Sequence, residues 1–87
     1  MDIVVSKDFA HALDSLSPSM RENVFRKIHS LVVDPAYPSL NTHRLNQIKS
    51  KDIRDCYITD SMRLLFEFTK GCLRLWDLGS HGIVDKV

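Results

Sequence analysis

The chain has 87 residues, of which 44% are hydrophobic and 26% are charged. This length predicts one domain spanning residues 1–87, and the ordinary composition argues against disorder. The net charge of +1 does not favour a general polyanion-binding protein. Lys and Arg nevertheless outnumber Asp and Glu by 8 to 6 from residue 41 onward. We therefore expect any anion-binding site in the C-terminal half.

The N-terminal half predicts one strand and two helices. The β-branched run at residues 3–5 is typical of a strand. Ser6 is a candidate N-cap for a first helix, because apolar residues follow it at helical spacing. Ser17-Pro18 ends that helix and begins a second one, with Pro18 in its first turn; Ser19 with Glu22 is an alternative capping box. Asp34-Pro35 ends the second helix.

The C-terminal half predicts an irregular connection over residues 35–51 and then three strands, over 54–59, 62–68 and 72–78. Two short turns join these strands, which indicates an antiparallel meander. The alternation in 62–68 places Arg63, Leu65 and Glu67 on one face, expected to be solvent-exposed and away from the helices. The predicted fold is α+β in the order β-α-α-β-β-β. Two N-terminal helices would pack on a four-stranded, mainly antiparallel sheet.

Cys56 and Cys72 lie in strand-like runs and lack the spacing of metal ligands. We expect both to be reduced, buried side chains, and we expect no cofactor and no metal. The chain contains no long apolar segment, and its first residues lack a basic stretch followed by an apolar one. These features predict a cytoplasmic protein that does not insert into a membrane.

Several short motifs follow one another from residue 43 onward. His43 precedes Leu45, Ile53 precedes Arg54-Asp55, the third strand carries Arg-Leu-Leu-Phe at 63–66, and Gly79-Ser80-His81 closes the last strand. In this order they resemble the RelE/ParE toxin superfamily, and within it the YafQ, YoeB and RelE branch of ribosome-dependent messenger RNA endonucleases. The resemblance implies a metal-independent endoribonuclease that acts on message at the ribosome. It also implies inhibition by a cognate antitoxin protein.

Metal-free RNA cleavage needs a group that deprotonates the 2′-hydroxyl, a cation beside the phosphate and a group that protonates the 5′-oxygen. Imidazole suits the proton transfers and guanidinium suits the phosphate. The resemblance assigns proton transfer to His43 and His81, and phosphate contact to Arg63. Arg54 either contacts phosphate at the sheet edge or holds Asp55 or Asp77 structurally.

The remaining candidates have ordinary structural alternatives. Tyr57 either stacks on a base and donates to phosphate, or is a core aromatic. Arg44, Lys49 and Lys51 either contact RNA backbone or belong to a solvated basic loop. His11 and His29 are expected on helix surfaces. Residues 83–87 lack the aromatic that several toxins of this branch carry there, so base stacking would fall to Trp76 or Tyr57.

Three other functions share the expected fold. A ParE-like toxin inhibits DNA gyrase by contact and would stay toxic without His43 and His81. A degenerate member would only bind an antitoxin and would not slow growth when expressed. An RNA-binding protein without cleavage activity would retain labelled RNA and produce no new ends.

Overall fold

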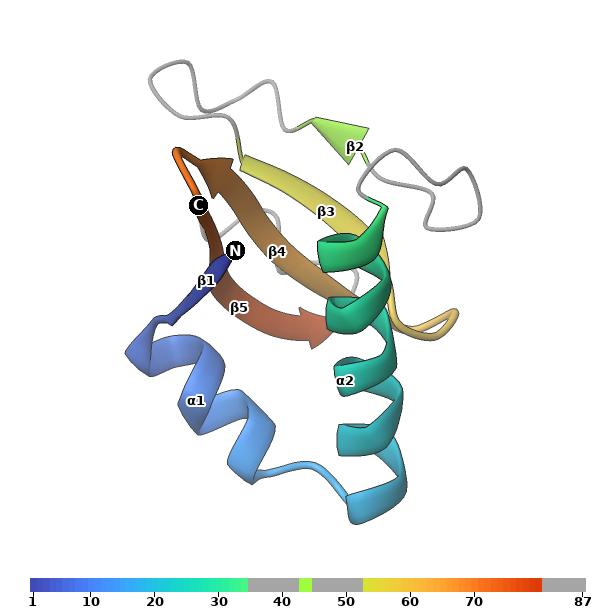
Figure 1. Cartoon of the computed structure of the whole chain (residues 1–87). Helices are drawn as coiled ribbons and strands as arrows, with labels where there is room; N and C mark the ends of the chain where they lie inside the picture. The colour runs from blue at the N-terminus through green and yellow to red at the C-terminus, as the bar shows by residue number, and fades with distance from the viewer. Residues whose placement is uncertain (35–42, 45–52, 81–87) are drawn as a thin grey trace.

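The protein forms a five-stranded mixed sheet in the spatial order β1-β5-β4-β3-β2. The computed structural model describes residues 1–34 and 53–80, together with the backbone of residues 43–44. The strands are β1 (Asp2–Val5), β2 (His43–Arg44), β3 (Ile53–Tyr57), β4 (Met62–Thr69) and β5 (Cys72–Ser80). β1 runs parallel to β5, and every other neighbouring pair is antiparallel. The N-terminal strand therefore lies beside the last strand (Figure 1).

Two helices, α1 (Lys7–Asp14) and α2 (Pro18–Val33), follow β1. Each begins at a serine whose Oγ accepts a hydrogen bond from a backbone N–H three residues on: Ser6 from Phe9 and Ser17 from Met20. Pro18 occupies the first turn of α2, where its missing N–H removes no helical bond. Ser17 is therefore the N-cap rather than the alternative Ser19. Asp34 caps the C-terminus, as predicted.

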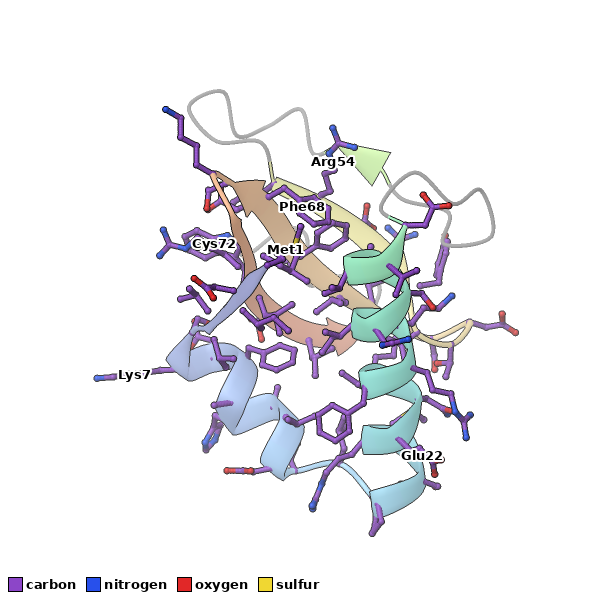
Figure 2. All side chains as sticks on the ribbon, in the orientation of Figure 1. Met1, Lys7, Glu22, Arg54, Phe68 and Cys72 are labelled. Carbon is purple, nitrogen blue, oxygen red and sulfur yellow. The ribbon has the colours of Figure 1, made fainter. Side chains whose placement is uncertain are left out.

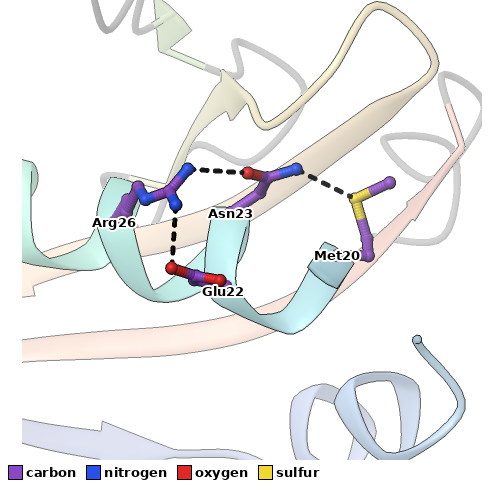
Figure 3. A network of polar contacts seen from close by, with 4 residues as sticks. All are labelled: Met20, Glu22, Asn23 and Arg26. Carbon is purple, nitrogen blue, oxygen red and sulfur yellow. Dashed lines mark hydrogen bonds and ion pairs between the residues drawn. The ribbon is translucent and has the colours of Figure 1, made fainter. Parts of the chain in front are cut away.

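The solvent side of α2 carries a short polar network (Figure 3). Arg26 Nη2 donates to Glu22 Oε1 at 2.8 Å, and Arg26 Nη1 donates to Asn23 Oδ1 at 3.2 Å. Asn23 Nδ2 lies 3.9 Å from Met20 Sδ. Both charged side chains are well exposed, so an ion pair with this spacing contributes about 0.3–0.5 kcal/mol. The network orients side chains along the helix and adds little to its stability.

The hydrophobic core lies between the two helices and one face of the sheet (Figure 1). Phe9 of α1 and Val24 and Leu31 of α2 are almost fully buried there. The sheet contributes alternate residues from three strands, namely Cys56, Leu64, Phe66, Leu73, Leu75 and Leu78. This arrangement confirms the predicted α+β fold with two helices on one face. No helix within the described residues is long and apolar enough to cross a bilayer.

A β-bulge interrupts the alternation of β5. Leu65 pairs with Asp77 while Phe66 pairs with Leu75, so Trp76 is an extra residue with no counterpart on β4. The inserted residue lets Leu75 and Leu78, three positions apart, both face the helices. Trp76 and Asp77 then face the other way. The indole of Trp76 donates to the Glu67 carboxylate at 3.1 Å, on the sheet face away from the helices.

The predicted exposure of that second face is wrong for two residues. Leu65 is only 1% exposed and Glu67 only 6% exposed. The buried Glu67 carboxylate has two partners on this face, because Trp76 Nε1 donates to it and Arg74 Nε lies 3.9 Å away. The predicted irregular connection over 35–51 also contains a feature not foreseen. Its residues His43–Arg44 form β2, which pairs with β3 and adds a fifth strand.

Candidate functional site

Arg63 is the centre of a polar cluster on the sheet face away from the helices. It lies on β4, directly opposite Tyr57 on β3 and opposite Gly79 on β5. Asp55 lies two residues before Tyr57 on β3, so it occupies the diagonal cross-strand position relative to Arg63. Antiparallel pairing alone thus brings three polar side chains together. Gly79 leaves the β5 side of Arg63 free of a side chain.

The Arg63 guanidinium is held by two charge-assisted hydrogen bonds. Nη1 donates to Asp55 Oδ2 at 2.5 Å and Nη2 donates to the Tyr57 hydroxyl at 2.6 Å. The guanidinium carbon also lies 4.5 Å from the centroid of the Tyr57 ring, within cation–π range. The Arg63 side chain is 13% exposed, and that of Asp55 is 1% exposed. The guanidinium is therefore a cation in a fixed orientation with a small opening to solvent.

Two buried atoms of this cluster lack a partner within the described residues, Asp55 Oδ1 and Arg63 Nε. Leaving a buried polar atom unpaired costs about 1–3 kcal/mol, and more when the group is charged. Native proteins rarely retain such atoms except at sites where a role explains them. The cluster therefore has hydrogen-bonding capacity that its own members do not use.

Position 43 belongs to the same face. His43 pairs directly with Asp55 across β2 and β3, and Arg44 pairs with Arg54. Directly opposite residues in an antiparallel pair share a face of the sheet. The backbone thus places position 43 beside the carboxylate that holds Arg63. The side chains of His43 and Arg44, and the predicted site residues Lys49, Lys51 and His81, lie outside the described residues.

Arg54 is not brought to this cluster. It pairs with Phe66, a fully buried residue of the helix-side core, so Arg54 lies on the opposite face from Arg63. Figure 2 places Arg54 at the end of β3 that borders β2. The sequence pattern did not show on which face of the sheet Arg54 lies, and the register of β3 with β4 shows it. Of the two predicted arginines on β3 and β4, only Arg63 belongs to the cluster.

Tyr57 is half-buried and makes its contacts with Arg63 rather than with the core. One alternative from the sequence, a core aromatic, is therefore wrong. The guanidinium covers one ring face, so that face is not available for stacking on a base. The hydroxyl accepts from Arg63, which leaves its own proton free to be donated.

Asp55 is the site residue that the sequence analysis missed. It entered that analysis only in the Arg54-Asp55 dipeptide and as a possible structural partner of Arg54. The signal was present in the pattern, because residues 55 and 57 share one face of a strand and that face meets Arg63. A carboxylate within a predicted strand, next to Cys56, is a candidate buried charge that needs a partner.

A second group lies on the same face around the bulge. Trp76 donates to Glu67, and the Arg74 guanidinium lies 5.6 Å from the centroid of the Trp76 ring. Beside it is a cavity of about 600 Å³, lined by Leu65, Leu78, Trp76, Asp77 and three residues of α1, Asp8, His11 and Ala12. The two carboxylates disfavour a phosphate in this cavity.

The remaining reactive groups support no other site. No group of three His, Cys, Asp or Glu residues within the described parts of the chain could hold a metal ion. Cys56 is buried in the core, and burial raises the pKa of its thiol to about 12, so it is not a nucleophile at neutral pH. Cys72 is half-buried, and both cysteines are free. His11 and His29 are exposed on their helices, as predicted.

The fold is similar to solved toxin structures over nearly their whole length. The crystal structure of YafQ from E. coli strain BL21(DE3) matches with a TM-score of 0.76 and 18% sequence identity, covering 95% of this chain and 96% of that one. The YoeB dimer from Staphylococcus aureus matches with a TM-score of 0.77 and 12% identity, covering 93% and 97%. The archaeal RelE-RelB complex from Pyrococcus horikoshii OT3 matches with a TM-score of 0.75 and 15% identity, covering 93% and 94%.

No protein-family model matches the chain, and no curated protein sequence matches it. The structural likeness therefore establishes the fold, which is RelE-like as predicted from the motifs after residue 43.

Proposed function

We propose that this chain is the toxin of a toxin–antitoxin pair and cleaves messenger RNA at the ribosome without a metal ion. The observation that carries the proposal is the Asp55–Tyr57–Arg63 cluster on the face of a RelE-like sheet that lies away from the helices. A guanidinium held by two neighbours stays in place as negative charge develops on a phosphate. Such preorganised charge is the largest single contribution in many enzymes.

The reaction is a transphosphorylation within the RNA strand. The 2′-oxygen attacks the neighbouring phosphorus as it loses its proton to a base, and the 5′-oxygen leaves as it accepts a proton from an acid. The products carry a 2′,3′-cyclic phosphate and a 5′-hydroxyl. Arg63 stabilises the charge on the phosphorane, and the Tyr57 hydroxyl is a further donor beside it. In this proposal His43 and His81 exchange the protons, since imidazole titrates near neutral pH.

Other basic residues would hold the RNA chain away from the reacting phosphate. Arg44, Lys49 and Lys51 belong to the segment that joins α2 to β3, and Arg54 borders it. Contacts of this kind are made to the phosphate backbone, so they weaken as salt concentration rises and carry no sequence information. Replacing them would lower affinity for all messages alike.

An antitoxin is the expected protein partner of this toxin. One of the similar structures is a RelE-RelB complex. In this chain, α2 exposes two apolar side chains, Phe25 at 53% and Val33 at 68%. An amphipathic segment of the antitoxin would bury them. Co-purification with the product of the adjacent reading frame, and loss of that complex in Phe25→Asp, tests this part of the proposal.

The decisive experiment maps new RNA ends in a translating extract. Wild type should cut message, and Arg63→Gln should cut it about 10²–10³-fold more slowly, as is typical when one charge-stabilising donor is removed. His81→Ala and His43→Ala should also lose activity. Arg74→Gln is the matched control, because it removes an arginine on the same face that lies outside the cluster. Its activity should remain within a few-fold of wild type.

The outcomes separate the alternatives. Toxicity that persists in the His43→Ala, His81→Ala double variant, without new RNA ends, would indicate a gyrase inhibitor, which a DNA supercoiling assay then identifies. The absence of both cuts and growth inhibition in the wild type would indicate an antitoxin-binding module. Equal cutting by Arg63→Gln and Arg74→Gln would refute the role assigned to Arg63.

A further inference from the structure

The edge strand β1 is unusually apolar for a strand with a free edge. Ile3, Val4 and Val5 are 47%, 42% and 49% exposed, and Met1 before them is 61% exposed. Natural sheets protect such edges with Lys, Pro, bulges or a covering segment, because an open edge pairs with other chains. β1 carries none of the first three, and its one charged residue is Asp2. Figure 2 shows Met1 at the start of this strand, beside Cys72 of β5.

The neighbouring strand β5 is protected against pairing with another chain where it extends beyond β1. β5 extends past the end of β1, and there the Leu78 N–H is bound by the Asp77 carboxylate at 2.8 Å. The Trp76 bulge distorts the same stretch, and the Trp76 carbonyl accepts from Ser6 Oγ. The backbone groups at this end of β5 are thus occupied locally, whereas no described residue pairs with the outer edge of β1.

The pairing of β1 with β5 determines which backbone groups point outward. Asp2 N–H donates to the Gly71 carbonyl, and Ser6 N–H donates to the Leu75 carbonyl. In a strand, alternate residues direct both their N–H and C=O to the same side. Residues 2, 4 and 6 therefore face β5, and Ile3 and Val5 present their N–H and C=O groups to the open edge.

We propose that this edge pairs with β1 of a second copy, antiparallel and centred on Val4. In that register Ile3 of one copy lies opposite Val5 of the other, and the two residues exchange both backbone hydrogen bonds. The second Ile3–Val5 pair does the same, which makes four new bonds. Val4 faces Val4 of the partner copy, and the two sheets become one continuous sheet with the helices on one side.

The side chains fit this register on both faces. Ile3 and Val5 share the helix side with Leu73 and Leu75, so the two cross-copy Ile3–Val5 pairs extend the apolar core. On the other face Val4 meets Val4, and Asp2 meets Ser6 rather than a second Asp2. No like charges are therefore opposed within β1, a condition that antiparallel pairing requires. Residues 2–6 of one copy can therefore pair with residues 6–2 of a second copy without an unfavourable contact.

The contact is small, since each copy contributes four strand residues. Interfaces well below the area of a standard stable complex are weak and transient. The dimer therefore forms as concentration rises rather than persisting at every concentration. This inference concerns the edge strand alone and does not depend on the proposed nuclease activity.

Disulfide trapping tests the register directly. In the Cys72→Ala background, Val4→Cys should form a disulfide-linked dimer under a mild oxidant, because facing residues of a non-hydrogen-bonded pair have Cα atoms about 4.5 Å apart. Val5→Cys is the matched control, because position 5 of one copy faces position 3 of the other. The two introduced cysteines therefore lie beyond the Cα–Cα distance of about 7 Å that a disulfide can span. Cys56 is buried and does not interfere.

A second measurement follows the association without oxidation. Sedimentation of the wild type from about 1 µM to 1 mM should show a monomer–dimer equilibrium. Ile3→Pro removes an outward N–H that the β1–β5 ladder does not use, so it should weaken dimerisation at least about tenfold, and Ile3→Ala, which keeps that N–H, controls for the loss of side-chain packing.

Four results would overturn the inference: equal crosslinking of Val4→Cys and Val5→Cys, no crosslinking of either, a monomer at all concentrations, or growth into large aggregates. Crosslinking of Val4→Cys only to an antitoxin would assign the edge to that partner instead.

Discussion

Replacing Asp55 with asparagine removes the charge that holds Arg63 and keeps the size of the side chain. Asp55 is 1% exposed and its partner 13% exposed, so the substitution leaves a largely buried guanidinium without a counter-charge. Replacing one partner of such a buried ion pair lowers the free energy of unfolding by about 3–5 kcal/mol. Because Arg63 retains the Tyr57 hydroxyl and some solvent access, we expect the lower end, about 3 kcal/mol.

That loss is large for a domain of this size. At about 0.05–0.15 kcal/mol per residue, the free energy of unfolding of an 87-residue domain is about 4–13 kcal/mol. A loss of about 3 kcal/mol corresponds to a fall in melting temperature of about 12–24 °C. Urea denaturation monitored by tryptophan fluorescence gives the free energy, since Trp76 lies on the same face of the sheet.

A double-mutant cycle identifies the cause of the loss. Asp55→Asn with Arg63→Gln removes both charges, so no unpaired buried charge remains, and the double variant should lose clearly less free energy than the sum of the two single losses. The coupling energy between the two positions should then exceed about 2 kcal/mol. Additive losses in the double variant would refute the reasoning. The double variant is also a folded protein without the guanidinium, which makes it the cleanest inactive control for RNA cleavage.

Four further predictions concern the described parts of the fold. Cys72 should react with a thiol reagent in the folded protein and Cys56 should react only on unfolding, because burial raises the pKa of Cys56 to about 12; equal rates for the two thiols would contradict this. Since the folded pKa is raised, the contribution of Cys56 to stability is lost as pH rises above its ordinary value of 9.0 towards 12, and Cys56→Ala should flatten that part of the pH–stability curve. Gly71→Ala should cost about 1 kcal/mol of unfolding free energy, because φ is 68° there and no atom lies within 4 Å of an added Cβ, and Gly71→Asn should cost less. Ser17→Ala should cost about 1 kcal/mol as a lost N-cap, and Ser6→Ala should cost more because Ser6 Oγ also binds the β5 backbone; a smaller effect at Ser6 would contradict that link.

Local signals made the helices predictable. Ser6 and Ser17 bind backbone N–H groups of their own helices, and Pro18 and Asp34 mark the ends of α2, so each feature depends on residues a few positions apart. The meander of β3, β4 and β5 follows equally from short turns. The features that escaped prediction depend on contacts between distant segments. The parallel pairing of β1 with β5 joins residues about 70 positions apart, and β2 depends on pairing with β3.

The site was predicted in part for the same reason. Alternation placed Arg63 on the correct face, but period-two reasoning treats charged residues as exposed. It therefore missed that Asp55 and Glu67 are buried because each has a cationic or N–H partner across the strands. The direction of Arg54 required the register with Phe66. One signal was available in the sequence, because the three-residue spacing of Leu75 and Leu78 breaks strict alternation and indicates the bulge at Trp76.

The pairing of the first strand with the last also has a consequence for the time at which the protein becomes folded. Among the described strands, β1 pairs only with residues 72–75 of β5, so this pairing cannot form until those residues have been synthesised. Contacts between segments so far apart form late, because closing the intervening loop costs entropy before the pairing returns any free energy. A nascent chain cannot complete this sheet while its C-terminal strand is still inside the exit tunnel. Under the proposed function, the Arg63 cluster therefore lacks its complete sheet until β5 has left the ribosome that is making the chain.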